Sequence, residues 1–128
     1  MSYKVYNPNP ANHSAGDCVI RCVCKLMNLD WDTAYLKVCM VGFKMKEVPT
    51  ANHVWGSFLF ENGFVKKVIP DTCPYCYTIR DFCVDHPFGE FAAATGSHVV
   101  AVVNGDYYDS WDSGNEVPVY YWERETIK

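Results

Sequence analysis

The stretch that decides the fold reads HVVAVVNGDYYDSW and spans residues 98–111. Its first six residues, His98 to Val103, are mostly β-branched and apolar, which predicts a buried strand. Asn104-Gly105 is a dipeptide typical of a two-residue turn between antiparallel strands. We therefore expect the residues from Asp106 to Asp112 to return as the second strand of a β-hairpin.

The turn also fixes which side chains share a face of that hairpin. With two turn residues, paired positions sum to 209, so His98 lies opposite Trp111. Paired residues share a face, and so do positions two apart along one strand. Asp109 therefore lies on the face of His98, one diagonal step away, whereas Asp106 and Asp112 lie on the other face. The register thus selects one carboxylate of three as the partner of the histidine.

The rest of the chain favours helices first and strands later. Apolar residues at helical spacing predict helices over 18–29, from about residue 32, over 52–61 and over 77–85. Short apolar runs predict strands over 64–69, 90–95 and 117–123. The first seventeen residues are rich in Asn, Pro, Ser and Gly and are expected to be irregular. This order predicts a single α+β domain over residues 1–128, with N-terminal helices packed on a C-terminal antiparallel β-sheet.

Composition narrows the classes of function. Of the 128 residues, 49% are hydrophobic and 20% are charged, which is enough apolar material for a buried core. The net charge of -4 argues against a nucleic-acid binder that works by bulk electrostatics. No apolar run approaches the roughly 18 residues of a membrane helix, and we expect no signal peptide because the first eight residues contain no apolar stretch. We expect a cytoplasmic protein without nucleic-acid or membrane partners.

Seven cysteines, an odd number without an export signal, do not indicate a disulfide framework. Cys18 stands out, because it follows Asp17, a good helix N-cap, and so opens the first predicted helix. The positive end of the helix dipole lowers the pKa of a thiol in that place and favours the nucleophilic thiolate. The structural alternative is a buried cysteine that happens to begin a helix.

A carboxylate that orients a histidine, combined with an activated cysteine, is the arrangement used for nucleophilic catalysis by a thiol. Cys18, His98 and Asp109 are therefore the candidate catalytic residues, with Trp111 shielding the histidine–aspartate contact from water. Asn12, six residues before Cys18, is a candidate donor to the oxyanion beside the backbone N–H of Cys18. The alternatives are a solvated strand aspartate and a turn-forming asparagine.

The chain resembles the papain-like cysteine peptidase superfamily in residues that occur in the order found in that family: Asn12, Cys18, His98, Asp109 and Trp111. The family has an oxyanion amide six residues before a cysteine that opens a central helix. It also has a histidine at the start of a strand, and an Asn-Ser-Trp segment in which the tryptophan shields the asparagine–histidine contact.

Two residues differ from the family pattern, since Asn12 replaces the usual glutamine and Asp109 replaces the usual asparagine. The chain is also about half as long as a full papain, so much of the usual substrate cleft is missing. It looks more like the compact bacterial and phage members, including bacteriocin-leader peptidases and cell-wall amidases.

The resemblance implies a thiol hydrolase, a cysteine peptidase or amidase, that acts on a peptide or protein substrate without a cofactor. Release of the acyl group to an amine would make it an acyl-transferase. The alternative is a non-enzymatic phage or bacterial binding or inhibitor module on the same scaffold.

A second cysteine group supports a different hypothesis. Cys73-Pro74-Tyr75-Cys76 has the spacing of a glutaredoxin redox motif, but it lies in mid-chain without a βαβ pattern. With residues further along, it forms a possible zinc set of a zinc-stabilised interaction domain: Cys73, Cys76, Cys83 and His86. The structural alternative is a turn before a helix, with buried thiols.

Overall fold

The structure is a computed structural model that describes residues 2–12, 16–71 and 73–125. The strands are β1 (Tyr3–Val5), β2 (Phe64–Val68), β3 (Glu90–Ala94), β4 (Val99–Val103), β5 (Asp106–Asp109) and β6 (Tyr120–Arg124). The helices are α1 (Cys18–Met27), α2 (Trp31–Met45), α3 (Asn52–Glu61) and α4 (Ile79–Asp85). The predicted α+β class is confirmed, and the element boundaries differ from the predicted ones by a few residues.

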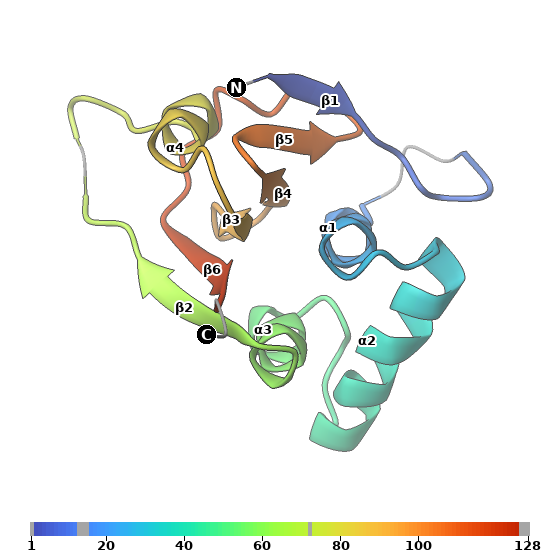
Figure 1. Cartoon of the computed structure of the whole chain (residues 1–128). Helices are drawn as coiled ribbons and strands as arrows, with labels where there is room; N and C mark the ends of the chain where they lie inside the picture. The colour runs from blue at the N-terminus through green and yellow to red at the C-terminus, as the bar shows by residue number, and fades with distance from the viewer. Residues whose placement is uncertain (1, 13–15, 72, 126–128) are drawn as a thin grey trace.

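The six strands form one mixed sheet in the order β1-β5-β4-β3-β6-β2 (Figure 1). All neighbours are antiparallel except β1, which pairs parallel to β5. The prediction of a purely antiparallel sheet after an irregular N-terminus is therefore wrong at this edge. The strand is held by contacts distant in sequence: the Tyr3 ring packs 5.5 Å from that of Tyr107, and the Ser2 N–H donates to the Asp106 carboxylate at 2.9 Å.

The predicted hairpin register is confirmed. Ala101 pairs with Tyr108, and Val103 pairs with Asp106, so both pairs sum to 209. The turn residues between the two strands have positive φ angles, 49° at Asn104 and 81° at Gly105. A two-residue turn with both φ angles positive has the twist that antiparallel strands require, and asparagine and glycine adopt it most readily.

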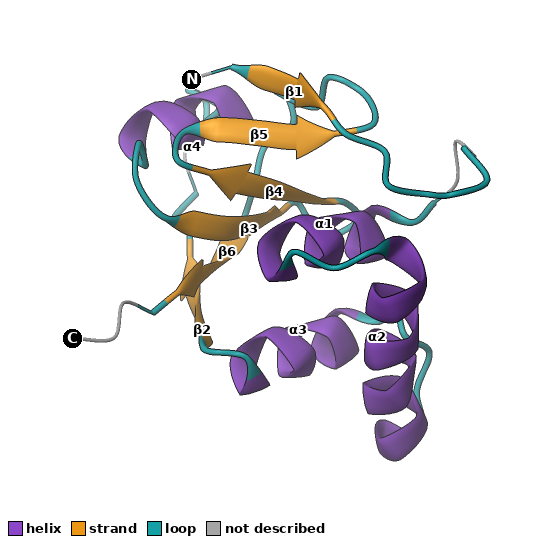
Figure 2. Cartoon of the chain, turned by 45° about the vertical axis from the view of Figure 1, so that its right-hand side comes forward, coloured by secondary structure: helices purple, strands orange, loops and turns teal. Residues whose placement is uncertain are grey.

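The helices cover the two faces of the sheet unequally. α1 and α3 lie on one face, and α4 lies on the other (Figure 1). α2 lies outside α1 and α3 and packs against both of them, away from the sheet (Figure 2). Two buried clusters result, because the apolar sheet residues on either face meet different helices. The strands β3 and β4 contribute to both clusters, which explains their nearly continuous apolar sequence.

Among the residues described, no helix combines the length and the apolar composition needed to cross a bilayer.

The loop after β5 is tightly packed around Gly114. A Cβ atom at this position would lie 2.7 Å from Cζ of Arg80 and closer still to the Tyr107 hydroxyl. The same loop accepts a hydrogen bond from the backbone N–H of Arg80, at the start of α4, through the carbonyl of Gly114 at 3.1 Å. Only glycine therefore fits between the helix and the sheet.

We expect Gly114→Ala to lower the free energy of unfolding by about 1–3 kcal/mol, the usual cost of overpacking. Urea unfolding followed by circular dichroism measures this change. Gly16→Ala is the matched control, because a Cβ there meets nothing within 4 Å. Equal stability of the two variants would contradict the tight packing of this loop.

Candidate active site

Cys18 is the first residue of α1, as predicted, and its side chain is half-buried. Its thiol is hydrogen-bonded to the side chain of His98, and the backbone N–H of Val99 donates to the sulfur. The N-terminus of α1 adds the partial positive charge of the helix dipole. The thiol therefore meets three groups that favour its anion.

His98 lies immediately before β4 and connects Cys18 to the hairpin. Its Nε2 atom lies 2.7 Å from Oδ2 of Asp109, so Nδ1 is the ring nitrogen left for Cys18. The hairpin register predicted this contact, since Asp109 and not Asp106 or Asp112 is the aspartate that contacts His98. The Trp111 ring lies 5.1 Å from the imidazole ring and is about half exposed, so it covers one side of the His98–Asp109 pair.

Asp109 is completely buried and has three hydrogen bonds and one ion pair. Its Oδ1 atom is paired with the Arg21 guanidinium at 2.9 Å and accepts from the backbone N–H of Ser110 at 2.8 Å. Its Oδ2 atom contacts His98 at 2.7 Å and accepts from the Ser113 hydroxyl at 2.6 Å. These four partners surround the carboxylate, which is how a buried charge is tolerated.

Arg21 is the residue whose role the sequence did not decide. It is buried, three residues after Cys18 on α1, and joins Asp109 to Asp17, whose Oδ1 lies 2.6 Å from its Nη1 atom. The indole N–H of Trp31 also donates to Asp17 at 2.9 Å. A single arginine thus ties the nucleophile helix to the hairpin carboxylate. The sequence signal for this role of Arg21 is a charged residue among the apolar residues on the buried face of the helix.

The expectation that Asp17 caps α1 with its side chain is wrong. Asp17 occupies the N-cap position, but its carboxylate makes no capping hydrogen bond. The carboxylate is engaged by Arg21 and Trp31 instead, because a buried guanidinium needs a partner charge more than the helix end needs a side-chain acceptor.

The pKa shifts of the three residues follow from these contacts. Burial raises the pKa of the Cys18 thiol, but hydrogen bonds from His98 and Val99 and the nearby positive charges outweigh it, so the pKa is lowered. Burial lowers the pKa of His98, but its bonds to Asp109 and Cys18 outweigh that effect and raise the pKa to about 9. The pKa of Asp109 is lowered by His98, Ser113 and Arg21 despite its burial. All three directions favour a thiolate, an imidazolium and a carboxylate.

A cavity of about 290 Å³ opens beside Cys18 and His98. Its walls come from the start of α1, the start of α3 and the turn between β3 and β4, and they include Asn52, Trp55 and Gly96. The thiol and the imidazole both border this space, so a substrate carbonyl placed in it can reach the nucleophile and the proton donor.

Asn12, the candidate oxyanion donor, is exposed, and its backbone N–H donates to the carbonyl of Asn9 at 2.9 Å. Its φ of 55° belongs to this turn, which presents the residue to solvent. It is not among the described residues that line the cavity, and positions 13–15 lie outside the described residues. The structure therefore does not bring Asn12 to Cys18, whereas it does place the backbone N–H groups of the α1 N-terminus there.

The possible zinc set is not assembled. Cys73 and Cys76 are exposed, whereas Cys83 is on the buried face of α4, within the core. The His86 ring stacks on Phe82 at 4.0 Å, and its Nδ1 lies 2.8 Å from the Phe82 carbonyl. Within residues 2–12, 16–71 and 73–125, no three His, Cys, Asp or Glu side chains are grouped so as to hold a metal ion.

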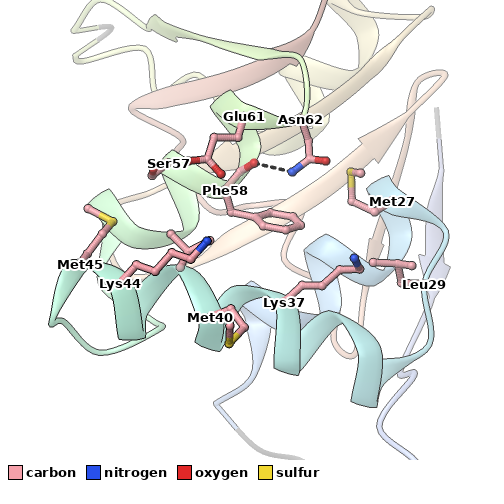
Figure 3. Close-up of a pocket in the computed structure, with 11 residues that line it drawn as sticks. Met27, Leu29, Lys37, Met40, Lys44, Met45, Ser57, Phe58, Glu61 and Asn62 are labelled. Carbon is pink, nitrogen blue, oxygen red and sulfur yellow. Dashed lines mark hydrogen bonds between the residues drawn. The ribbon is translucent and has the colours of Figure 1, made fainter.

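A larger cavity, of about 580 Å³, lies between the helices (Figure 3). Met27, Met40 and Met45 border it, together with Lys37, Lys44 and other residues of α2 and α3. Neither a cysteine nor a histidine is among the described residues that line it, so the candidate catalytic residues Cys18 and His98 border only the smaller of these two cavities.

Comparison of the chain with protein-family models, with curated proteins and with solved structures found no match.

We expect Arg21→Met to lower the free energy of unfolding by about 3–5 kcal/mol, because it leaves the buried carboxylates of Asp17 and Asp109 without their shared partner. Lys67→Met is the control, since it removes an exposed ion pair with Glu123 and is expected to cost less than about 1 kcal/mol. Urea unfolding at neutral pH measures both changes. A similar small loss in both variants would show that Arg21 does not hold this site together.

Proposed function

We propose that this protein is a thiol hydrolase, a cysteine peptidase or amidase, that uses Cys18, His98 and Asp109 on a peptide or amide-linked substrate. One observation carries the proposal: the His98 Nε2 atom lies 2.7 Å from a fully buried carboxylate, and the same histidine stabilises the thiolate of half-buried Cys18. The sequence resemblance to papain-like peptidases supports the same assignment of roles. The cavity beside the thiol supplies room for the scissile group.

In the proposed reaction the Cys18 thiolate attacks the carbonyl carbon of the substrate and forms a C–S bond. The negative charge that develops on the carbonyl oxygen is stabilised by backbone N–H groups at the α1 N-terminus. The C–N bond then breaks as His98 transfers its Nδ1 proton to the leaving amine, which departs from an acyl-enzyme. Asp109 holds the Nε2–H and stabilises the imidazolium before transfer.

Release of the acyl group reverses the proton transfers. His98, now neutral, takes a proton from water, whose oxygen attacks the thioester carbon and expels the Cys18 thiolate. An amine in place of this water would give acyl transfer to the amine.

All seven cysteines are free thiols, which fits a reducing compartment such as the cytoplasm.

The buried charges of Asp109 and Arg21 favour a hydrolase over a protein with a purely binding role. A stable core needs neither an ionised aspartate nor an arginine at this depth, because apolar residues of similar volume serve stability as well or better. The four groups that contact Asp109 have a purpose if its partner His98 must carry and release a proton.

The reactivity of Cys18 tests the proposed ion pair. We expect iodoacetamide to modify Cys18 rapidly at pH values well below about 8.5, the reference pKa of a free thiol, since His98 stabilises the thiolate. In the variant His98→Ala this fast reaction is lost. Mass spectrometry that resolves each site measures both rates, with exposed Cys73 and Cys76 as internal references. A Cys18 no faster than these two thiols would contradict the proposal.

The pH dependence of turnover tests the role of His98 as an acid. The protonated imidazole is the proton donor and the thiolate is the nucleophile, so activity is retained between the lowered pKa of Cys18 and the raised pKa of His98, and is lost as pH rises through about 9. We expect kcat/KM for a random-sequence peptide mixture, followed as new amino termini, to fall on that alkaline limb. His98→Ala is expected to reduce turnover by about 10²–10⁴-fold.

Asp109→Asn removes the negative charge beside the imidazolium and is expected to move the alkaline limb to lower pH. Circular dichroism confirms that the variant is folded. A limb that keeps its position in folded Asp109→Asn would show that Asp109 does not act on His98.

A further inference from the structure

A second hollow adjoins the active-site cavity and is not used by the reaction just described. It has a volume of about 540 Å³ and lies between the outer side of α3 and the strands β6 and β2. Three aromatic side chains border it: Phe60, Tyr120 and Trp122. We call this hollow the aromatic trough.

The aromatic trough and the active-site cavity share a wall. Asn52, the first residue of α3, borders both of them. Trp55 borders the active-site cavity, and its ring stacks on Tyr120 of the trough, with 6.4 Å between the centroids. The Asn52 side chain is fixed to this pair, because it accepts a hydrogen bond from the Trp55 indole at 3.1 Å. The two hollows therefore adjoin at Asn52 and at the Trp55–Tyr120 stack.

The trough presents apolar surface with one lysine. Phe60 is 66% exposed, although burial of such a ring in a protein core is favourable. Gly56 makes room for Trp122, since a Cβ atom there would lie 2.9 Å from Cζ2 of the indole. Lys66 places its Nζ 4.6 Å from the centre of the Tyr120 ring.

Charge in and around the trough favours an acidic ligand. No carboxylate is among the described residues that line it, although the chain as a whole has a net charge of -4. Two acidic groups that contact its rim or lie next to it in sequence have partners: Glu47 lies 3.5 Å from His53, and Glu123 is paired with Lys67 at 2.5 Å. Lys66 thus remains available to a carboxylate brought by a ligand.

We propose that the substrate is a polypeptide whose chain continues from Cys18 past Asn52 into the aromatic trough. An apolar side chain of the substrate packs on Phe60 and Trp122, and a neighbouring Asp or Glu pairs with Lys66. This proposal rests on the proposed hydrolase function and adds the class of substrate and its recognised feature.

The position of that feature follows from helix geometry. Asn52 and Phe60 are eight residues apart on α3, and a helix rises 1.5 Å per residue, so they are separated by about 12 Å. An extended peptide advances about 3.3 Å per residue. The recognised apolar and acidic residues therefore lie about four residues beyond the substrate residue that contacts Asn52, and still further from the scissile bond at Cys18.

The test uses a mixture of random-sequence decapeptides, with cleavage products read by mass spectrometry. We expect wild type to cleave preferentially those peptides that carry an apolar residue next to an acidic one more than about four residues from the cut. Phe60→Ser and Lys66→Glu each lower this preference about tenfold, which corresponds to loss of one apolar or charged contact. Both changes act on KM, because the trough does not touch the reacting atoms.

Two matched controls separate the trough from a general surface effect. Phe43 on α2 is 68% exposed, and Lys46 places its Nζ 4.3 Å from the Phe43 ring, so this pair reproduces the chemistry of the trough elsewhere. Phe43→Ser and Lys46→Glu should leave the preference unchanged. An equal loss in these controls would overturn the proposal.

The outcomes also distinguish this proposal from the proposed function. If wild type cleaves and Cys18→Ala does not, but the preference is confined to residues beside the cut, the hydrolase function stands and the trough proposal fails. If wild type cleaves no better than Cys18→Ala, both fail together.

Discussion

Asp109 carries a charge in a place that water does not reach, and the arrangement around it determines much of the molecule. Removing one partner from a buried ion pair costs about 3–5 kcal/mol, a large part of the stability of a small domain. Each of the four groups that contact the Asp109 carboxylate therefore holds a segment of the chain in place. Arg21 fixes α1 to the hairpin, His98 fixes the start of β4, and Ser110 and Ser113 fix the loop after β5.

The same charge connects the fold to the proposed chemistry. A fully buried carboxylate on one side of an imidazole and a half-buried thiol on the other stabilise the imidazolium from both sides. Cys18 borders a cavity, whereas the Asp109 carboxylate is fully buried. Of these two groups, only the thiol is therefore available to a substrate. Burial therefore distinguishes the two ends: the Asp109 charge is fully buried, and the half-buried Cys18 thiol, which we propose to react, borders the cavity.

The site was predictable from the sequence where local rules determine geometry. A two-residue turn at Asn104-Gly105 fixes the register of the hairpin, and the register alone singles out Asp109. The start of α1 at Cys18 follows from the helical spacing of the apolar residues after it. These features depend on neighbours within about a dozen residues, so sequence patterns report them well.

What the sequence did not predict depends on distant contacts. Strand β1 has three residues and gains its stability from β5, more than a hundred positions later, so no periodicity marks it. Asp17 has the residue type of a helix cap, but the buried charge of Arg21 competes for its carboxylate and wins. The position of Asn12 depends on the path of a loop, which spacing from Cys18 does not determine.

The proposed chemistry requires that His98 is held as an imidazolium between Cys18 and Asp109. The most direct test is a pH titration of the His98 ring nitrogens by ¹⁵N NMR, in wild type and in Cys18→Ser. We expect that in wild type both nitrogens stay protonated at neutral pH and that the ring loses a proton near pH 9, and that this pKa falls in Cys18→Ser. A wild-type His98 that titrates near its ordinary value of 6.5, unchanged in Cys18→Ser, would contradict it.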